Sequence, residues 1–196
     1  MSGPHEYELL DSEEVYSGRV ISLRRDTVAM PGGGESVREV VRHPGAVAVV
    51  ALDDDDRVVL VRQYRHPVAE RLWELPAGLR DADGEPPVET ARRELAEEAL
   101  LAAGRWSLLA TTYNSPGFCD EQVLVYLAED LAETARPDGF VVEHEEADMT
   151  LERLPLAEAV QWVADGRIRN GSSVVGVLAA AQVRAGTYRP TPVAPD

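Results

Sequence analysis

Cysteine and basic residues are scarce in this chain of 196 residues. The lone cysteine, Cys119, has no partner for an internal disulfide, so we expect a reducing compartment. Lysine and arginine together number 19 against 35 aspartates and glutamates, which gives a net charge of −16. Nonspecific nucleic-acid binding needs a basic surface, so we expect no nucleic-acid partner.

Long apolar runs are also missing. No run approaches the roughly 18 apolar residues of a membrane-spanning helix. Residues 1–14 have neither the basic start nor the apolar centre of a signal peptide. We therefore expect a soluble cytoplasmic protein without a membrane partner. Hydrophobic residues still make up 44% of the chain, which is enough for the core of one domain.

The most informative stretch covers residues 78–101. Its second half predicts a helix, because apolar residues recur there at helical spacing behind two prolines that suit a first turn. Glu94, Glu97 and Glu98 fall at i, i+3 and i+4, so their carboxylates converge on one patch. A solvated helix face has the same pattern, but a divalent cation such as Mg²⁺ would turn the mutual repulsion into a binding site.

The whole stretch resembles the Nudix box, the signature of hydrolases that act on nucleoside diphosphates linked to another moiety. The resemblance rests on these residues in order: Gly78, Glu85, Arg93-Glu94-Leu95 and Glu97-Glu98. The seven residues between Glu85 and Arg93 match the spacing of the family. Together with the upstream glycine and glutamate, the helix pattern favours a site over a solvated face.

Two positions depart from that box. Six residues, in place of the usual five, separate Gly78 from Glu85, with Asp83-Gly84 as the extra turn. Leu100 stands where the family has a glycine, which would end the helix in a left-handed cap. The exact end of the helix therefore stays open.

Further segments resemble the ADP-ribose pyrophosphatase branch of this family, namely VRQYRHP and WELPAG before the box and SPGFCDE after it. The resemblance implies an α/β fold, an α/β/α sandwich with a mixed sheet. We expect it over residues 44–186, with an antiparallel hairpin or sheet over 1–43 and a disordered tail over 187–196. In this branch the amino-terminal sheet packs against a second subunit, which implies a homodimer; an edge decoration is the alternative.

The residues also predict individual elements. We expect a last helix that begins at Ser172 or Ser173 and ends at Gly186, and a loop over 129–140. The predicted strands cover 18–28, 35–42, 45–52, 57–64, 105–114, 121–127 and 149–154, and another helix covers 156–164.

The resemblance implies a set of site residues. Glu94, Glu97, Glu98 and the Ala77 carbonyl would hold Mg²⁺, with Mn²⁺ as an alternative, and Glu97 would also serve catalysis. Arg93 belongs to the catalytic set and is expected to anchor the motif loop by pairing with Glu85. Substrate binding would fall to Arg65, on a phosphate, and to Glu74, Gly117 and Phe118. A surface salt bridge is the simpler interpretation of Arg65.

Hydrolysis also needs a base, and glutamates bound to a metal serve poorly. The acidic stretch 143–148 is either a solvated loop or a mobile loop that closes on substrate and supplies this base. By the resemblance the base is Glu146, with Glu145 as the fallback.

The implied function is Mg²⁺-dependent hydrolysis of ADP-ribose to AMP and ribose 5-phosphate. One alternative is the same chemistry on another nucleoside diphosphate sugar. The other is a catalytically silent Nudix-fold module that senses a nucleotide or serves as a scaffold. The intact glutamates favour an enzyme, and Leu100 is the feature that favours the silent module.

Overall fold

The computed structural model describes residues 7–136 and 149–194. The chain divides into two compact units. The first comprises residues 1–45 and 113–122, and the second comprises 46–112 and 123–196. The first unit therefore includes a segment from the middle of the chain, which the predicted boundary at residue 43 did not anticipate.

The first unit contains an antiparallel sheet in the order β1-β2-β3. These strands are β1 (Leu9–Ser17), β2 (Ser22–Ala29) and β3 (Glu35–Arg42). The predicted strand over 18–28 is wrong in its first residues, and β1 was missed altogether. Two register shifts interrupt the pairing of β1 with β2, so β1 lacks the regular alternation that identifies a strand in sequence.

The second unit is built on a mixed sheet in the order β11-β8-β9-β4-β7. Strand β4 pairs in parallel with β9 and antiparallel with β7. The bounds are β4 (Ala46–Ala51), β7 (Ala77–Leu79), β8 (Leu101–Tyr113), β9 (Gln122–Glu133) and β11 (Thr191–Pro192). A separate antiparallel sheet has the order β10-β5-β6, from β5 (Arg57–Arg65), β6 (Glu70–Glu74) and β10 (Thr150–Pro155), with a short 3₁₀ helix, η1 (His66–Val68).

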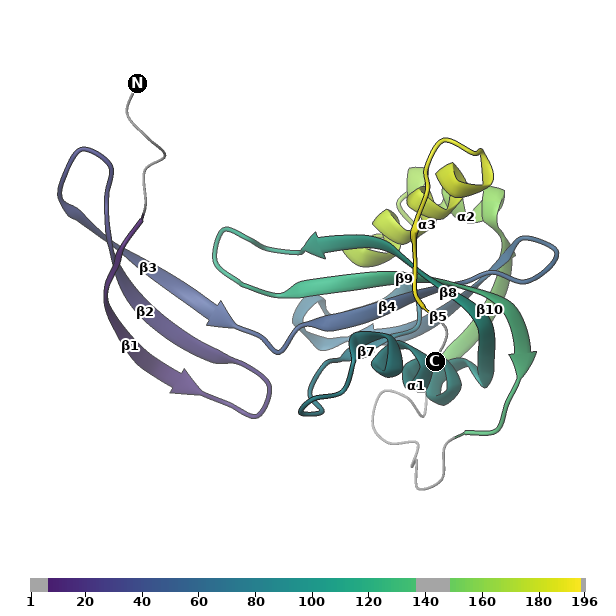
Figure 1. Ribbon diagram of the computed structural model, residues 1–196, viewed down its shortest axis with the longest axis horizontal. Coiled ribbons are helices and arrows are strands. Elements are labelled where there is room, and N and C mark those ends of the chain that lie inside the picture. The colour runs from purple at the N-terminus through teal and green to yellow at the C-terminus, as the bar shows by residue number, and fades with distance from the viewer. Residues whose placement is uncertain (1–6, 137–148, 195–196) are drawn as a thin grey trace. The chain divides into compact units, whose positions relative to one another are not determined.

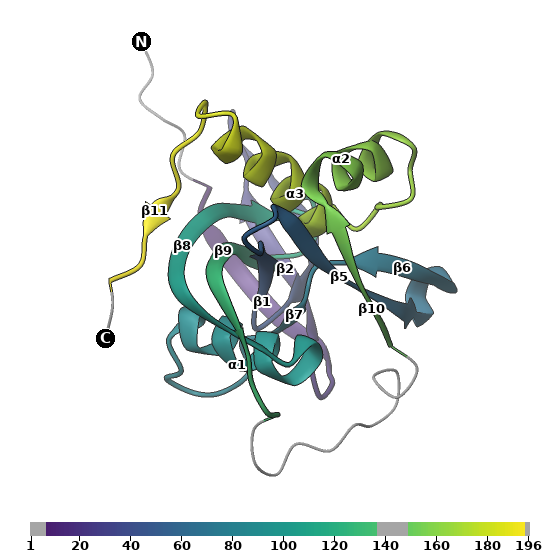
Figure 2. The ribbon, with the colours of Figure 1, turned by 90° about the vertical axis from the view of Figure 1, so that its right-hand side faces the viewer.

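Helices cover both faces of the mixed sheet (Figures 1 and 2). Helix α1 (Pro87–Ala99) packs on one face, and α2 (Leu156–Ala164) and α3 (Gly171–Arg184) lie on the other. Strand β4 contributes to both cores, which explains why its residues form one continuous apolar run. The predicted α/β/α sandwich with a mixed sheet is confirmed.

Several predicted boundaries differ from the structure. Asn170, and not Ser172 or Ser173, caps α3, because its Oδ1 accepts a hydrogen bond from the Ser173 N–H at 3.0 Å. The buried Ser173 hydroxyl accepts the Leu75 N–H at 2.9 Å, so it ties α3 to the connection between β6 and β7. The region from residue 129 onward was predicted as a loop, but β9 continues to Glu133.

The carboxyl-terminal residues were predicted to be disordered. Thr191–Pro192 instead pair with β8, and the Val193 N–H donates to the Trp106 carbonyl at 3.0 Å. A proline-rich composition resembles that of a disordered segment, but an edge strand offers unpaired backbone groups to any nearby extended chain. Within the described residues, no helix is long and apolar enough to cross a membrane.

Gly176 determines how closely α3 can approach the sheet. A Cβ atom at this position would lie 2.6 Å from Leu75 Cδ1 and 2.9 Å from Val50 Cγ2. We expect Gly176→Ala to lower the free energy of unfolding by about 1–2 kcal/mol, because overpacking outweighs the better helix propensity of alanine. Urea unfolding measures the change. Val175→Ala, on the exposed side of the same helix, is the control; an unchanged Gly176→Ala variant would contradict this packing.

Candidate active site

Helix α1 carries the three glutamates of the box, and they are more buried than a solvated helix face. Ala91 and Leu95 are fully buried and fasten α1 to the sheet. The side chains of Glu94 and Glu97 are each 13% exposed, and Glu98 is 7% exposed. A carboxylate so far from water needs a partner, because burial of an unpaired charge is costly.

Arg93 is the partner shared by most of this cluster. Its Nη1 lies 2.9 Å from Glu94 Oε1 and 3.1 Å from Glu97 Oε2. The predicted pair with Glu85 is also present, with Nε and Nη2 each 3.4 Å from a carboxylate oxygen. One guanidinium thus contacts three carboxylates and links the motif loop to the helix.

Glu85 also accepts a hydrogen bond from a residue other than Arg93. The Thr90 hydroxyl donates a hydrogen bond of 2.8 Å to Glu85 Oε2. This bond, followed by those from Arg93, lowers the pKa of Glu85 below its ordinary value. Glu85 therefore remains ionised, and its charge anchors the loop between β7 and α1.

The surroundings of Glu94 shift its pKa in the opposite direction to that of Glu85. The pKa of Glu94 is raised to about 7, first by burial and then by the nearby charge of Glu97, against the opposing attraction of Arg93. Its carboxylate lies so close to Gly78 that a Cβ atom there would be 2.0 Å from Glu94 Oε1. The motif needs a glycine at this position because of this close approach.

Glu98 points to the strand before the motif loop. Its Oε2 accepts the Ala77 N–H at 2.9 Å. This bond brings Ala77, the first residue of β7, beside the carboxylate of Glu98. A metal site made of Ala77 and the three glutamates requires this proximity. The role of the Ala77 carbonyl in such a site stays a prediction.

The cluster has the chemistry of a site for a hard cation. All of its donors are oxygens, which Mg²⁺ prefers, and the guanidinium of Arg93 provides positive charge where two carboxylates meet. In the described part of the chain, no three His, Cys, Asp or Glu side chains are arranged closely enough to hold a metal ion. In this structure the carboxylates are directed to Arg93 and to the Ala77 N–H.

Arg65 and Glu74, both predicted to contact substrate, are bonded to each other. Arg65 Nη2 lies 2.6 Å from Glu74 Oε2, and its Nε lies 3.1 and 3.2 Å from the two carboxylate oxygens. Glu74 is 1% exposed, whereas the Arg65 side chain is 43% exposed. The salt bridge considered for Arg65 is therefore present, and its partner is a buried carboxylate.

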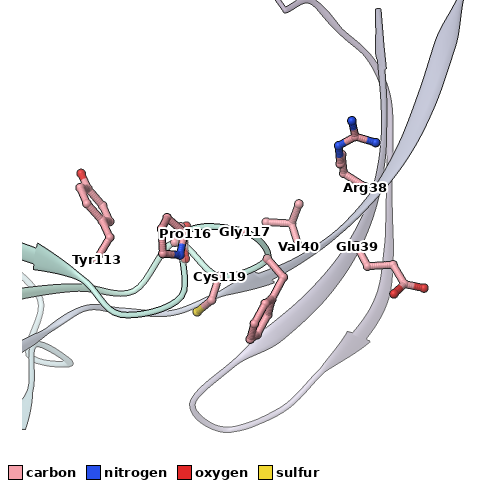
Figure 3. Close-up of a pocket in the computed structure, with 9 residues that line it drawn as sticks. Arg38, Glu39, Val40, Tyr113, Pro116, Gly117 and Cys119 are labelled. Atoms are coloured by element: carbon pink, nitrogen blue, oxygen red, sulfur yellow. The ribbon is translucent and has the colours of Figure 1, made fainter. Parts of the chain in front are cut away.

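The first unit contains an open pocket of about 470 Å³ (Figure 3). Both Gly117 and Phe118, predicted for substrate binding, line it, together with Arg38, Glu39, Val40, Tyr113, Pro116, Cys119 and Asp120. Phe118 and Tyr113 are 57% and 55% exposed, so two aromatic rings are available to a ligand. Arg38 was missed in the sequence, because its proximity to Gly117 is purely spatial, whereas Tyr113 lies only four residues before Gly117.

Backbone pairing fixes one wall of this pocket. The Val41 N–H donates to the Phe118 carbonyl at 2.7 Å, and the Asp120 N–H donates to the Val41 carbonyl at 3.2 Å. The Asp120 carboxylate also accepts the His43 N–H at 2.8 Å and pairs with Arg42 at 2.9 Å. The 113–122 segment is therefore attached to the end of β3.

Glu145 and Glu146, the predicted bases, lie outside the described residues.

Comparison with known families identifies the family of this chain. The NUDIX domain model matches residues 42–171, and the model of the nucleoside diphosphate sugar hydrolase N-terminal domain matches residues 7–41. The chain belongs to the Nudix family, and it is a Nudix hydrolase.

Individual proteins resemble it over nearly their whole length. An ADP-ribose pyrophosphatase of Mycobacterium tuberculosis is 50% identical, over 96% of this chain and 90% of that protein. A methanol dehydrogenase activator of Bacillus methanolicus is 38% identical, over 88% of this chain and 91% of that protein. The crystal structure of an ADP compounds hydrolase has the same fold, with a TM-score of 0.80 at 22% identity, over 95% and 98% of the two chains.

Leu100, at the position of the motif glycine, ends α1 in the conformation that glycine would adopt. Its φ and ψ are 57° and 37°, and its N–H bonds to the Ala96 carbonyl at 3.2 Å. The left-handed region costs a non-glycine residue about 1–2 kcal/mol. The departure from the motif therefore leaves the end of the helix in place and makes it strained.

We expect Leu100→Gly to be more stable than Leu100→Ala by roughly 0.5–1 kcal/mol, although glycine is the more flexible residue in the unfolded chain. Both variants lose the same atoms beyond Cβ, so their difference isolates the left-handed backbone. Ala99→Gly, one residue earlier inside the helix, should destabilise the protein instead. Thermal unfolding of the three variants measures this; an alanine variant as stable as the glycine variant would contradict the strain.

Proposed function

We propose that this Nudix hydrolase cleaves the pyrophosphate bond of ADP-ribose and releases AMP and ribose 5-phosphate. The reaction class rests on one observation, the buried cluster of Glu94, Glu97 and Glu98 on α1 beside Arg93. The choice of substrate rests on the 50% identity to an ADP-ribose pyrophosphatase over almost the whole chain.

The proposed metal ligands are Glu94, Glu97, Glu98 and the Ala77 carbonyl. A bound Mg²⁺ or Mn²⁺ neutralises charge on phosphoryl oxygens and lowers the pKa of a bound water. Arg93 keeps its contact with Glu85 and so holds the motif loop against the helix while the other carboxylates turn to the cation. Gly78 leaves room for the carboxylate of Glu94, which a Cβ atom at this position would displace.

Glu146 would orient the attacking water and accept its proton, with Glu145 as the alternative. The water oxygen forms a bond to one phosphorus atom as the bridging P–O bond breaks, and the bridging oxygen leaves with the other phosphate. A general base of this kind typically contributes about 10²–10⁴ to the rate.

Substrate binding is proposed for Arg65, Glu74, Gly117 and Phe118. A guanidinium has five N–H donors in a planar fork, so Arg65 can stay bonded to Glu74 while it donates to a phosphate. A Cβ atom added at Gly117 would have no neighbouring atom within 4 Å, and the φ of Gly117 is not positive. The fold itself does not demand glycine at this position, so close approach of a ligand is a reason for it.

We also propose a cytoplasmic homodimer. None of the hydrophobic side chains of β1, β2, β3 or the 113–122 segment is buried. Leu9, Val15, Tyr16 and Val37 are 53–58% exposed. A sheet without a buried face lacks the packing that stabilises small sheets, and a second copy would provide it.

Product analysis tests the reaction. Incubated with ADP-ribose and MgCl₂, the wild type should release AMP and ribose 5-phosphate. Glu98→Gln should lose activity because a metal ligand is weakened, and Glu146→Gln should be slower by about 10²–10⁴-fold. Glu158→Gln, on an exposed position of α2, should match the wild type and serves as the control.

Other outcomes point to the alternatives. Full activity of Glu146→Gln would transfer the base to Glu145. A wild type inert with ADP-ribose but active with another nucleoside diphosphate sugar would change the substrate and keep the chemistry. Inactivity with all of these sugars, together with nucleotide binding, would identify a silent sensor or scaffold.

Substitutions in the sheet of the first unit test whether this sheet forms the dimer interface. We expect the wild type to have about twice the monomer mass of 21.4 kDa by light scattering, and Val15→Asp/Val37→Asp to be monomeric, because charges would be buried in the interface. Val68→Asp, on an equally exposed valine of the second unit, is the control. A monomeric wild type, or a dimeric double variant, would refute an interface on this sheet.

A further inference from the structure

The carboxyl-terminal end of α1 receives hydrogen bonds from a distant part of the chain. The last carbonyls of a helix have no partner within it. Here the Glu97 carbonyl accepts a bond of 3.0 Å from Arg136 Nε, and the Leu100 carbonyl accepts one of 3.0 Å from the Thr134 N–H. Both donors lie just beyond the end of β9 at Glu133.

These bonds support the part of the helix that carries the carboxylates. Glu97 and Glu98 belong to its last turn, and Leu100 closes that turn in a strained left-handed conformation. A guanidinium is also favourable at this end, since the carboxyl terminus of a helix carries partial negative charge. The hydrogen bonds from residues 134–136 thus support the end of α1, where Leu100 is strained.

We propose that Arg136 is a positioning residue for the carboxylates of Glu97 and Glu98. It acts through the Glu97 carbonyl, by holding the last turn of α1 in place. This role rests on the proposed function, since it matters for catalysis only if these glutamates hold the metal. Small displacements are costly because metal ligands tolerate little error in geometry.

Leu100 makes the last turn of α1 dependent on Arg136. A glycine cap adopts the left-handed conformation without strain, so the last turn would keep its geometry unaided. With Leu100 in this place, external bonds are needed to keep the turn closed. The loss of Arg136 should therefore be suppressed by Leu100→Gly and not by Leu100→Ala.

Mn²⁺ binding to the substrate-free protein tests this, with free Mn²⁺ measured by electron paramagnetic resonance. We expect Arg136→Ala to raise the dissociation constant by about tenfold, in the range seen when groups that support metal ligands are removed. Arg136→Ala/Leu100→Gly should regain most of the affinity, and Arg136→Ala/Leu100→Ala should not. Arg189→Ala, which removes one exposed arginine, controls for net charge and should bind as the wild type does.

Glu98→Gln separates the two proposals. If Glu98→Gln binds Mn²⁺ as well as the wild type, the proposed metal site is wrong. If Glu98→Gln loses affinity while Arg136→Ala keeps it, only the role of Arg136 is overturned. Weakened binding that glycine at position 100 does not restore also overturns it, because the effect would then not pass through the cap. Arg136→Met, of similar length and without a donor, replaces the alanine variant if that one does not fold.

Discussion

The candidate site depends on one constraint, which is that three carboxylates lie close together where little water reaches them. Glu94, Glu97 and Glu98 lie within about one turn of α1, and little of their surface reaches water. Arg93 offsets part of their repulsion and links two of them to Glu85. Gly78 and the Ala77 N–H complete the arrangement, since one gives Glu94 room and the other holds Glu98. The pieces around α1 therefore serve one electrostatic arrangement.

The carboxylate cluster and the pocket belong to different compact units of the chain. The carboxylates lie in the unit with the mixed sheet, whereas the pocket is formed by β3 and the 113–122 segment. The Asp120 carboxylate bonds to consecutive residues at the end of β3, so this segment has a defined place in the first unit.

Local patterns predicted much of the fold and placed the three glutamates of the candidate site on one helix. The period of α1 and the spacing of its glutamates were evident from the chain, as were the buried run of β4 and the whole of α2. Strand β1 was missed because its register shifts break the alternation, and Asn170 was missed as a cap because two serines nearby are equally good caps in sequence. The partner of Arg65 was not predictable, since Glu74 joins it only across paired strands.

The sequence by itself determined that three carboxylates share one face of a helix, with a glycine and a glutamate upstream, because helical periodicity depends on the covalent chain alone. Only the tertiary structure decided that Leu100 can close that helix, that residues 134–136 support its end, and that the tail pairs with β8. These features need segments from distant parts of the chain to share burial and hydrogen bonds. No local pattern contains that information, since the energy of each contact depends on both partners at once.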